Sequence, residues 1–213
     1  MKPLLITDCD EVLLHMVRHF RGWLDEAHRI DFTFTQDFAN AMTRADGSKP
    51  TQAEMWALLG GFFPGQMHRQ TIVPHAREAL ARIAERAEIV VLTNLEDHCQ
   101  THRVDQLAVH GIAHRAECNQ GGKGAAVARL VEEHGHPVTV FVDDLGVHHA
   151  SVAEAAPSVH LLHMVAEPDL APLVEKAQAA HARIDDWREA ADWIEARFAS
   201  GLPADAVAGR ASA

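Results

Sequence analysis

Two pairs of acidic residues each follow a short apolar run in this sequence. The four carboxylates are Asp8, Asp10, Asp143 and Asp144, and the runs before them are Leu4–Thr7 and Val138–Val142. If these runs are strands of one sheet, the carboxylates crowd at its edge, where two charges about 4 Å apart repel by about 4 kcal/mol at an effective dielectric near 20. A divalent cation relieves that repulsion, and a set made only of oxygen ligands suits Mg2+. The sequence therefore predicts one Mg2+ site formed by these acids.

Carboxylates placed beside Mg2+ can carry out phosphoryl transfer. With the cation bound, Asp8 can approach a phosphate dianion and attack phosphorus, which gives an aspartyl-phosphate and divides a difficult hydrolysis into two easier steps. Asp10, two residues further on, can reach the same site. It would protonate the leaving alcohol and then deprotonate the attacking water. We therefore expect Asp8 to be the nucleophile and Asp10 to be the general acid and base.

Polar residues that can hold a phosphate follow at two later positions. Thr93 and Asn94 end the apolar run Ile89–Thr93, and Lys123 begins a helical pattern behind the turn 119–122. The Thr93 hydroxyl and the N–H groups around Asn94 can hydrogen-bond phosphate oxygens, and Lys123 can balance the negative charge of the transferred group. The GGKG segment is not a P-loop, because GxxxxGK(S/T) would need glycine at Glu117 and a hydroxyl at Gly124.

Alternating strand and helix patterns would bring these residues together. Four apolar runs, Leu4–Thr7, Ile89–Thr93, Val138–Val142 and Val159–Met164, alternate with helical patterns such as Ala76–Ala87 and Lys123–Glu133. A weaker extended stretch, Ala113–Cys118, can add a further strand. This alternation predicts an α/β fold with a parallel sheet covered by helices on both sides. Ligands of such sheets bind beyond the carboxyl ends of the strands, where the predicted site residues all fall.

A long segment interrupts the alternation after the first strand. Residues 15–72 contain no convincing strand, but Met16, Phe20, Trp23 and Leu24 recur at helical spacing and a second helix is expected near Ala53–Leu59. We interpret this insertion as a helical cap over the site; the alternative is an irregular excursion packed on the core. The expected organisation is a core of residues 1–14 and 73–199, a cap of residues 15–72 and a flexible tail of residues 200–213, with a last helix striped by Trp187, Ala191, Ile194 and Phe198.

These four motifs, in this order, resemble those of the haloacid dehalogenase superfamily in its phosphatase form. LLITDCDEVLL is similar to the first motif, IVVLTN to the second, Lys123 at a helix start to the third and TVFVDDLGV to the fourth. The resemblance covers roughly residues 1–14 and 73–165. It implies a Rossmann-like sheet with a small helical cap of the C1 type. It also implies Mg2+ held by Asp8, the backbone carbonyl of Asp10 and an acid of the last motif, with Asp144 the direct ligand and Asp143 supporting it.

This sequence departs from the family pattern at two positions. Glu11 stands where glycine is most common after the second aspartate, which adds charge beside the site. His148 stands four residues past Asp144, where some members carry another acid. Neither change removes a predicted catalytic group.

Composition limits the partners and the compartment. The 213 residues carry 19 basic and 30 acidic side chains, a net charge of −11, which disfavours nucleic acid and anionic membranes as partners. The three cysteines form no CxxC pattern, and the sixteen histidines share no ligand spacing. There is no apolar run of roughly 18 residues or more, and the N-terminus resembles a strand rather than a signal peptide. We therefore expect a cytoplasmic protein with free thiols, and the sequence is silent on its oligomeric state.

The leading hypothesis for function is a Mg2+-dependent phosphomonoesterase of a small phosphorylated metabolite, since a capped site favours sugar phosphates, nucleotides or similar molecules. The cap offers four basic residues as candidate substrate contacts: Arg18, Arg21, Arg44 and Lys49. A 2-haloacid dehalogenase is the first alternative, although that chemistry has no leaving alcohol for Asp10 to protonate. An alternative of another class is a phospho-accepting signalling domain, whose paired acids follow the first strand and whose acceptor follows the third. In this chain the adjacent acids, Asp143 and Asp144, come last.

Overall fold

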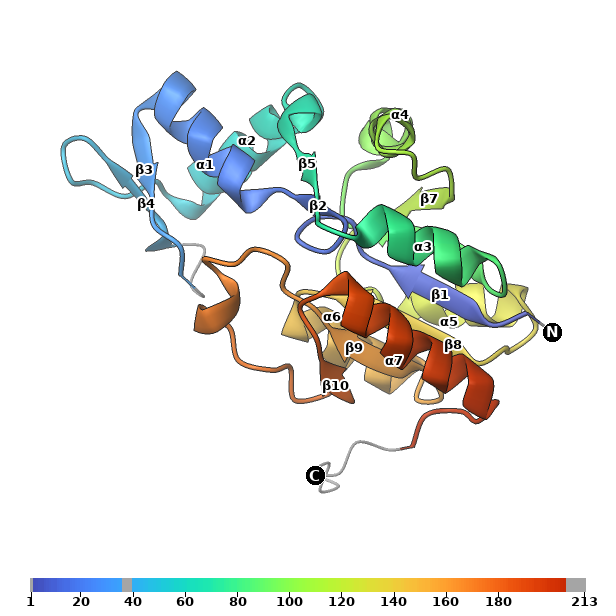
Figure 1. The fold of residues 1–213 in the computed structure, drawn as a ribbon. Coiled ribbons are helices and arrows are strands. Elements are labelled where there is room, and N and C mark those ends of the chain that lie inside the picture. The colour runs from blue at the N-terminus through green and yellow to red at the C-terminus, as the bar shows by residue number, and fades with distance from the viewer. Residues whose placement is uncertain (1, 36–39, 206–213) are drawn as a thin grey trace.

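The computed structural model describes residues 2–35 and 40–205, and its centre is a parallel sheet of six strands (Figure 1). Their order across the sheet is β10-β9-β8-β1-β6-β7. Their bounds are Leu4–Thr7 for β1, Glu88–Thr93 for β6, Arg115–Cys118 for β7, Thr139–Asp143 for β8, His160–His163 for β9 and Ala182–Arg183 for β10. Every described pairing in this sheet is parallel, as the alternation of strand and helix patterns predicted.

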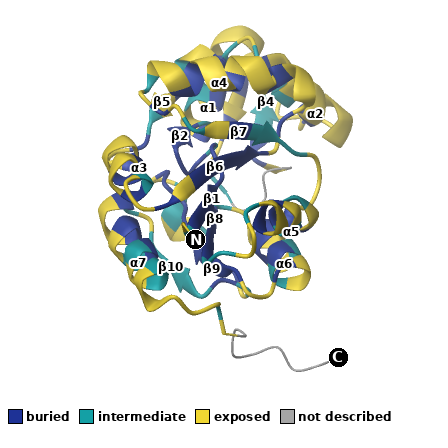
Figure 2. Ribbon diagram, turned by 90° about the vertical axis from the view of Figure 1, so that its right-hand side faces the viewer, coloured by how far each residue is buried: buried dark blue, intermediate teal, exposed yellow. Residues whose placement is uncertain are grey.

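Side chains along the central strands alternate between two apolar layers. Leu5 of β1 belongs to the layer under α3 (Ala76–Ala84) and α7 (Trp187–Ser200). Leu4 and Ile6 belong to the opposite layer, under α5 (Gly124–Glu133) and α6 (Gly146–Ala155). Figure 2 shows these two helix pairs on either side of the buried strands. Because both faces are covered, the central strands consist of uninterrupted apolar residues, which is why they were visible in the sequence.

Strand register brings the predicted site segments to one edge. Thr7 of β1 pairs with Val91 of β6 on one side and with Val142 of β8 on the other. Asp8 continues in that direction, and its N–H donates to the carbonyl of Val142 at 2.8 Å. The carboxyl ends of β1, β6 and β8 therefore lie side by side, with β1 in the middle.

The segment inserted after β1 has an apolar core of its own. It contains α1 (Val17–Trp23), a π-helical turn (Leu24–His28), a hairpin of β3 (Ile30–Phe32) and β4 (Met42–Arg44), α2 (Gln52–Phe62) and a 3-10 turn (Met67–Arg69). The ring of Phe20 stacks on Trp23, with centroids 6.0 Å apart, and makes a T-shaped contact with the ring of Phe62, with centroids 5.5 Å apart. The chain enters through β2 (Leu14–His15) and leaves through β5 (Thr71–Ile72), which pair antiparallel.

The hairpin corrects the expectation that residues 15–72 contain no strand. Ile30 and Phe32 are buried on either side of exposed Asp31, an alternation typical of a half-buried strand but only three residues long. The helical pieces near Met16 and Ala53 were predicted correctly.

The chain end differs in part from the expected tail. α7 ends at Ser200, and Gly201 adopts the left-handed conformation (φ 65) that often ends a helix. The carbonyls of Leu202 and Asp205 lie 3.0 and 2.9 Å from ring nitrogens of His160 and His181, so residues 201–205 contact the core. The remaining expected tail, 206–213, lies outside the described residues. None of the described helices is long and apolar enough to cross a membrane. Two short 3-10 turns, Asp97–Cys99 and Ala171–Leu173, and α4 (Gln100–Val109) complete the described elements.

Candidate active site

Lys123 lies between two of the predicted carboxylates. It caps the start of α5, and its Nζ is 2.7 Å from Asp8 Oδ1 and 2.7 Å from Asp143 Oδ2. Its side chain is fully buried. Burial alone would lower the pKa of Lys123, but the charges of Asp143 and Asp8 outweigh it and raise that pKa. Lys123 is therefore a buried cation held by two carboxylates and not a surface residue at a helix start.

Three carboxylates converge at this edge closely enough to hold a metal ion. Oxygen atoms of Asp8, Asp143 and Asp144 all lie within 4.8 Å of one another. Burial raises the pKa of Asp8, which Lys123 lowers and Asp143 raises further. Burial, followed by the charges of Asp143 and Asp8, raises the pKa of Asp144 well above its usual value. One lysine does not balance three acids, so a divalent cation with oxygen ligands fits the donor set.

The two acids of the last motif differ in their contacts. Asp143 accepts from Lys123 with one carboxylate oxygen and from the N–H of Leu145 (2.9 Å) with the other. The carboxylate of Asp144 makes no hydrogen bond to a described residue. Its backbone carbonyl lies 2.8 Å from Nε2 of His163. Asp143 is therefore engaged in orienting Lys123, while the Asp144 carboxylate has its oxygens available to a ligand.

The hydroxyl of Thr93 is also available. Thr93 ends β6, is fully buried, and its Oγ1 has no hydrogen-bond partner among the described residues. Asn94 is engaged differently, since its Oδ1 accepts from Asn119 Nδ2 (2.8 Å) and its Nδ2 donates to the Gly121 carbonyl (2.8 Å). The side chain of Asn94 thus connects β6 to the loop before Lys123. A buried hydroxyl without a hydrogen-bond partner costs free energy. Thr93 is therefore suited to donate a hydrogen bond to an oxygen of a ligand.

Asp10 is oriented by two residues that the sequence did not single out. Its Oδ1 accepts from Gln70 Nε2 and its Oδ2 from a guanidinium nitrogen of Arg103, both at 2.6 Å. Arg103 is fully buried in α4, and Gln70 directly precedes β5. A lone arginine in a helical pattern carries no signal in the sequence, which is why these contacts were missed. Asp10 lines the same cleft as Asp8, and each of its carboxylate oxygens accepts one of these hydrogen bonds.

Several solved structures of haloacid dehalogenase-like proteins share this architecture. A haloacid dehalogenase-like hydrolase from Burkholderia xenovorans aligns over 92% of this chain and 98% of its own, with a TM-score of 0.61 and 12% identity. A haloacid dehalogenase-like hydrolase from Streptococcus pneumoniae aligns over 91% of this chain and 98% of its own, with a TM-score of 0.62 and 8% identity. The chain has the haloacid dehalogenase fold. No family model and no curated protein matches the sequence.

Two further structures with this fold show its range. A haloacid dehalogenase-type hydrolase from Bacillus subtilis, solved bound to magnesium, aligns over 91% of this chain and 99% of its own (TM-score 0.60, 12% identity). A structure from Thermotoga maritima assigned as a β-phosphoglucomutase aligns over 92% and 99% (TM-score 0.58, 15% identity). At these identities the likeness establishes the fold alone.

In this haloacid dehalogenase fold, Glu11 has a structural role. It adopts a left-handed φ of 58, where glycine is easiest to accommodate, which accounts for the family's preference at this position. Its buried Oε1 accepts from the N–H groups of Met16 (2.7 Å) and Val17 (2.5 Å), so it caps the entry to α1. Burial is the main cause that raises the pKa of Glu11 to about 7. The side chain therefore anchors α1 to the loop that follows Asp8.

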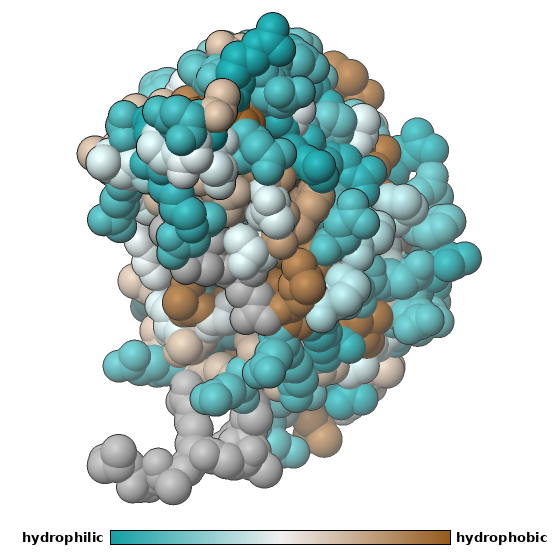
Figure 3. All heavy atoms as spheres, turned by 90° about the vertical axis from the view of Figure 1, so that its left-hand side faces the viewer, coloured by the Kyte–Doolittle hydropathy of each residue, from teal (hydrophilic) through white to brown (hydrophobic). Residues whose placement is uncertain are grey.

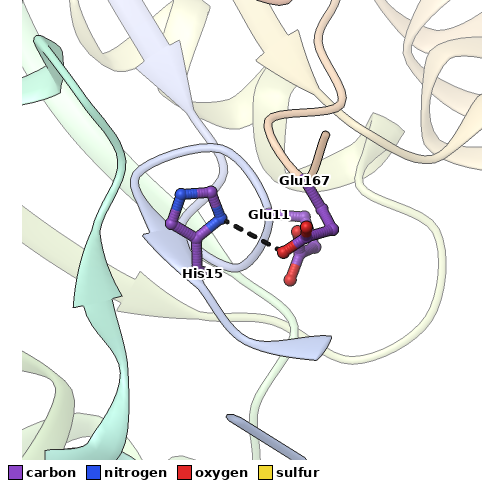
Figure 4. A group of neighbouring side chains, drawn as sticks. All are labelled: Glu11, His15 and Glu167. Atoms are coloured by element: carbon purple, nitrogen blue, oxygen red, sulfur yellow. Dashed lines mark ion pairs between the residues drawn. The ribbon is translucent and has the colours of Figure 1, made fainter. Parts of the chain in front are cut away.

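Glu11 is part of a buried group that links the inserted segment, residues 15–72, to the core; this segment is called the cap below. Figure 4 shows Glu11, His15 and Glu167 pointing toward one another, with His15 Nδ1 3.6 Å from Glu167 Oε2. Their ligand atoms are close enough to hold a metal ion. However, Arg18 already binds both oxygens of Glu167, at 2.6 and 2.9 Å. We therefore interpret the group as an ion-paired connection between the cap residue Arg18 and the core segment after β9.

A cleft between cap and core opens onto the carboxylates. It holds about 1070 Å³, and Asp8, Asp10, Asn94, Asp144 and His148 all line it. The proposed cap contacts do not: Arg18 pairs with Glu167, Arg44 with Glu54, Lys49 contacts Asn40, and the guanidinium of Arg21 lies over Phe34. These four candidate substrate contacts are therefore engaged by local acids, an amide and an aromatic ring rather than by the cleft.

Proposed function

We propose that this chain is a Mg2+-dependent phosphomonoester hydrolase that uses Asp8 as its nucleophile. The observation that supports it most strongly is the buried arrangement of Asp8, Lys123 and Asp143, with Asp144 close by, at the carboxyl ends of adjacent strands. The proposed substrate is a small phosphorylated metabolite, because the cleft is covered by the cap.

In the first half of the reaction, a carboxylate oxygen of Asp8 attacks phosphorus and the bond from phosphorus to the ester oxygen breaks. Asp10 gives its proton to the departing alcohol. The Thr93 hydroxyl and the N–H groups that follow it hold the phosphate oxygens. Lys123 stays in contact with Asp8 and balances the charge that collects there. The product of this half is an aspartyl-phosphate at Asp8 and a free alcohol.

In the second half, water attacks the phosphorus of the aspartyl-phosphate. Asp10 now accepts the proton of that water, and the bond to Asp8 breaks. Inorganic phosphate leaves, and both aspartates return to their starting states. The cation proposed at Asp8, Asp143, Asp144 and the Asp10 carbonyl would neutralise charge on the phosphate and on the carboxylates.

The test compares p-nitrophenyl phosphate hydrolysis by the wild-type protein in Mg2+, in EDTA, and in EDTA followed by excess Mg2+. We expect activity to disappear with EDTA and to return with Mg2+, and we expect Asp8→Asn to show none in any buffer. Full activity in EDTA would contradict the metal dependence. Release of halide from 2-haloacids without metal would instead favour the dehalogenase alternative.

A further inference from the structure

The walls of the cleft indicate which phosphate esters fit it, and this inference rests on the proposed function. The volume of about 1070 Å³ is at the upper end of the roughly 300–1,000 Å³ typical of small-molecule sites, so there is room for a leaving group beyond the phosphate. Apolar side chains from both parts of the chain line it, among them Trp56, Leu59 and Phe63 of the cap and Leu145, Val147 and Leu170 of the core. The part of the cleft beyond the carboxylates is therefore mostly apolar.

Several of these apolar side chains are exposed to solvent. Trp56 is 60% exposed, Leu145 48% and Val147 70%, and all three line the cleft. Figure 3, which views the molecule from the cap side, shows apolar side chains at the surface among polar ones. Exposed apolar surface gains free energy when a ligand covers it, at a rate proportional to the area removed from water. A leaving group with apolar surface would gain from contact with these walls.

The only basic side chains in the described lining of the cleft are His98, which lies 3.2 Å from Glu96, and His148. No lysine or arginine of the described residues lines it, whereas Glu11 and Glu96 add to the carboxylates of the site. The sequence of residues 36–39, QDFA, also contains no lysine or arginine. Lys123 is held between Asp8 and Asp143 and does not line the cleft. Away from the proposed metal site, a second anionic group on the substrate would meet carboxylates and no lysine or arginine of the described lining.

We propose that the substrate carries a single phosphate on an uncharged, largely apolar alcohol, such as an alkyl or aryl monophosphate. The same walls disfavour bisphosphates, nucleoside polyphosphates and phosphorylated carboxylic acids, because each carries a further anionic group. The phosphate itself is recognised by the catalytic residues, and the cleft selects the alcohol.

The experiment measures kcat/KM for a series of n-alkyl phosphates from ethyl to hexyl, in Mg2+, together with a hexyl phosphate that ends in a carboxylate. We expect kcat/KM to rise about fourfold for each added methylene, which is the factor for burying one CH2 group. The ester that ends in a carboxylate should fall roughly tenfold or more below hexyl phosphate, because its second charge faces acids.

Variants of Trp56 test whether this cleft is responsible. Trp56→Ala should reduce the gain per methylene, and Trp56→Arg should raise the activity on the carboxylate-ended ester relative to hexyl phosphate. The matched control is Val109→Ala, an apolar residue that is 84% exposed at the end of α4 and does not line the cleft. The control should reproduce the wild-type series.

The outcomes separate this inference from the proposed function. Hydrolysis of all esters with no dependence on chain length, or with equal activity on the carboxylate-ended ester, overturns the inference and leaves the phosphatase intact. If kcat/KM depends on chain length in the wild type and Trp56→Ala does not change that dependence, the assignment of alcohol binding to this cleft is overturned. Absence of hydrolysis on every ester overturns both proposals.

Discussion

At the scale of single residues, the main feature is a buried lysine shared by two carboxylates. Lys123 is fully buried, and its Nζ lies 2.7 Å from carboxylate oxygens of both Asp8 and Asp143. The positive charge of Lys123 therefore compensates the two buried negative charges. Removing one member of a buried ion pair leaves an uncompensated charge and typically costs about 3–5 kcal/mol. Under the proposed mechanism, a change at Lys123 should therefore alter both catalysis and stability.

Lys123→Met should lower the free energy of unfolding by about 3–5 kcal/mol, measured by urea denaturation in EDTA, because Asp8 and Asp143 remain without their cation. The double variant Lys123→Met/Asp143→Asn should regain part of this loss, since one of the two carboxylates becomes neutral, but it should not regain activity. Lys2→Met, an exposed lysine paired with Glu88, is the control and should change stability little. Unchanged stability in Lys123→Met would contradict the ion-pair account.

Asp10→Asn should affect substrates according to their leaving group. An alkyl alcohol needs a proton to depart, so its ester should lose activity by the 10²–10⁴-fold typical of general acid catalysis. p-Nitrophenolate leaves without a proton, so rapid-quench measurements should show a burst of nitrophenol followed by slow turnover. Mg2+ affinity is measured alongside, because the Asp10 carbonyl is a proposed ligand. Equal losses on both substrates with normal Mg2+ affinity and no burst would exclude Asp10 as the acid and base.

The sequence predicted where the candidate site residues that follow strands would lie, and it missed the residues that contact Asp10. Asp8, Thr93 and Asp143 stand at strand ends, where strand patterns and the geometry of parallel sheets determine their position. Arg103 and Gln70 contact Asp10 from segments distant in the sequence, and no local pattern marks such contacts. Tertiary packing alone brings them together.

At the scale of elements, Lys123 is positioned by close packing of α5 on α6. Gly124, the first residue of α5, lies so near Ser151 of α6 that an added Cβ would be 2.7 Å from the Ser151 Oγ and would also meet its backbone. The N–H of Gly124 donates to that same Oγ at 3.0 Å. A side chain at this position would therefore push α5, and Lys123 with it, away from the sheet.

Gly124→Ala should destabilise the protein by about 1–3 kcal/mol, the usual range for overpacking, and should also lower kcat. The matched control is Gly22→Ala in α1, where an added Cβ meets nothing within 4 Å. That change should be neutral or stabilising by up to about 1 kcal/mol, because alanine favours helix. Thermal unfolding and turnover of both variants provide the comparison. Equal stability of the two variants would show that α5 and α6 are not packed this closely.

Element prediction succeeded where apolar runs were long or repeated. β1 was predicted with its observed bounds, and the other main strands within about two residues, because they are buried on both faces. The β3–β4 hairpin was missed, since its strands have three residues each and periodicity over so short a segment carries little information.

At the scale of the whole molecule, cap and core are connected by buried charge near the site. Arg18 of the cap binds Glu167 of the core, and His15 lies beside them. Burial, followed by the charge of Arg18, lowers the pKa of His15 to about 4. Folded protein therefore keeps His15 neutral at pH values where the unfolded chain protonates it.

This connection predicts a pH dependence of stability. The pKa of His15 falls from about 6.5 in the unfolded chain to about 4 in the folded protein. The neutral side chain therefore makes its full contribution to the free energy of unfolding above pH 6.5. As the pH drops toward 4, the free energy of unfolding decreases by up to about 3 kcal/mol. The free energy of unfolding of wild type, minus that of His15→Gln, should therefore decrease between pH 6.5 and 4 and stay constant from 6.5 to 8. A difference that does not vary with pH would contradict the buried neutral state.

The overall architecture was easier to predict from the sequence than the residues that line the cleft. The order of apolar runs and acidic residues was sufficient for an α/β sheet with an insertion after its first strand. The partners of the cap arginines were not predictable, because Arg18 meets Glu167 only when the segment after β9 folds back beneath the cap. The apolar lining likewise combines residues from both parts of the chain.

The most direct test of the central claim is to trap the phosphoryl group on the enzyme. The protein is mixed with an aryl phosphate and Mg2+, quenched in acid within milliseconds, digested and analysed by mass spectrometry. We expect one phosphoryl group on the peptide that contains Asp8, formed only with Mg2+ and absent from Asp8→Asn. Hydrolysis by Asp8→Asn, or a phosphoryl group on a different residue, would contradict Asp8 as the nucleophile.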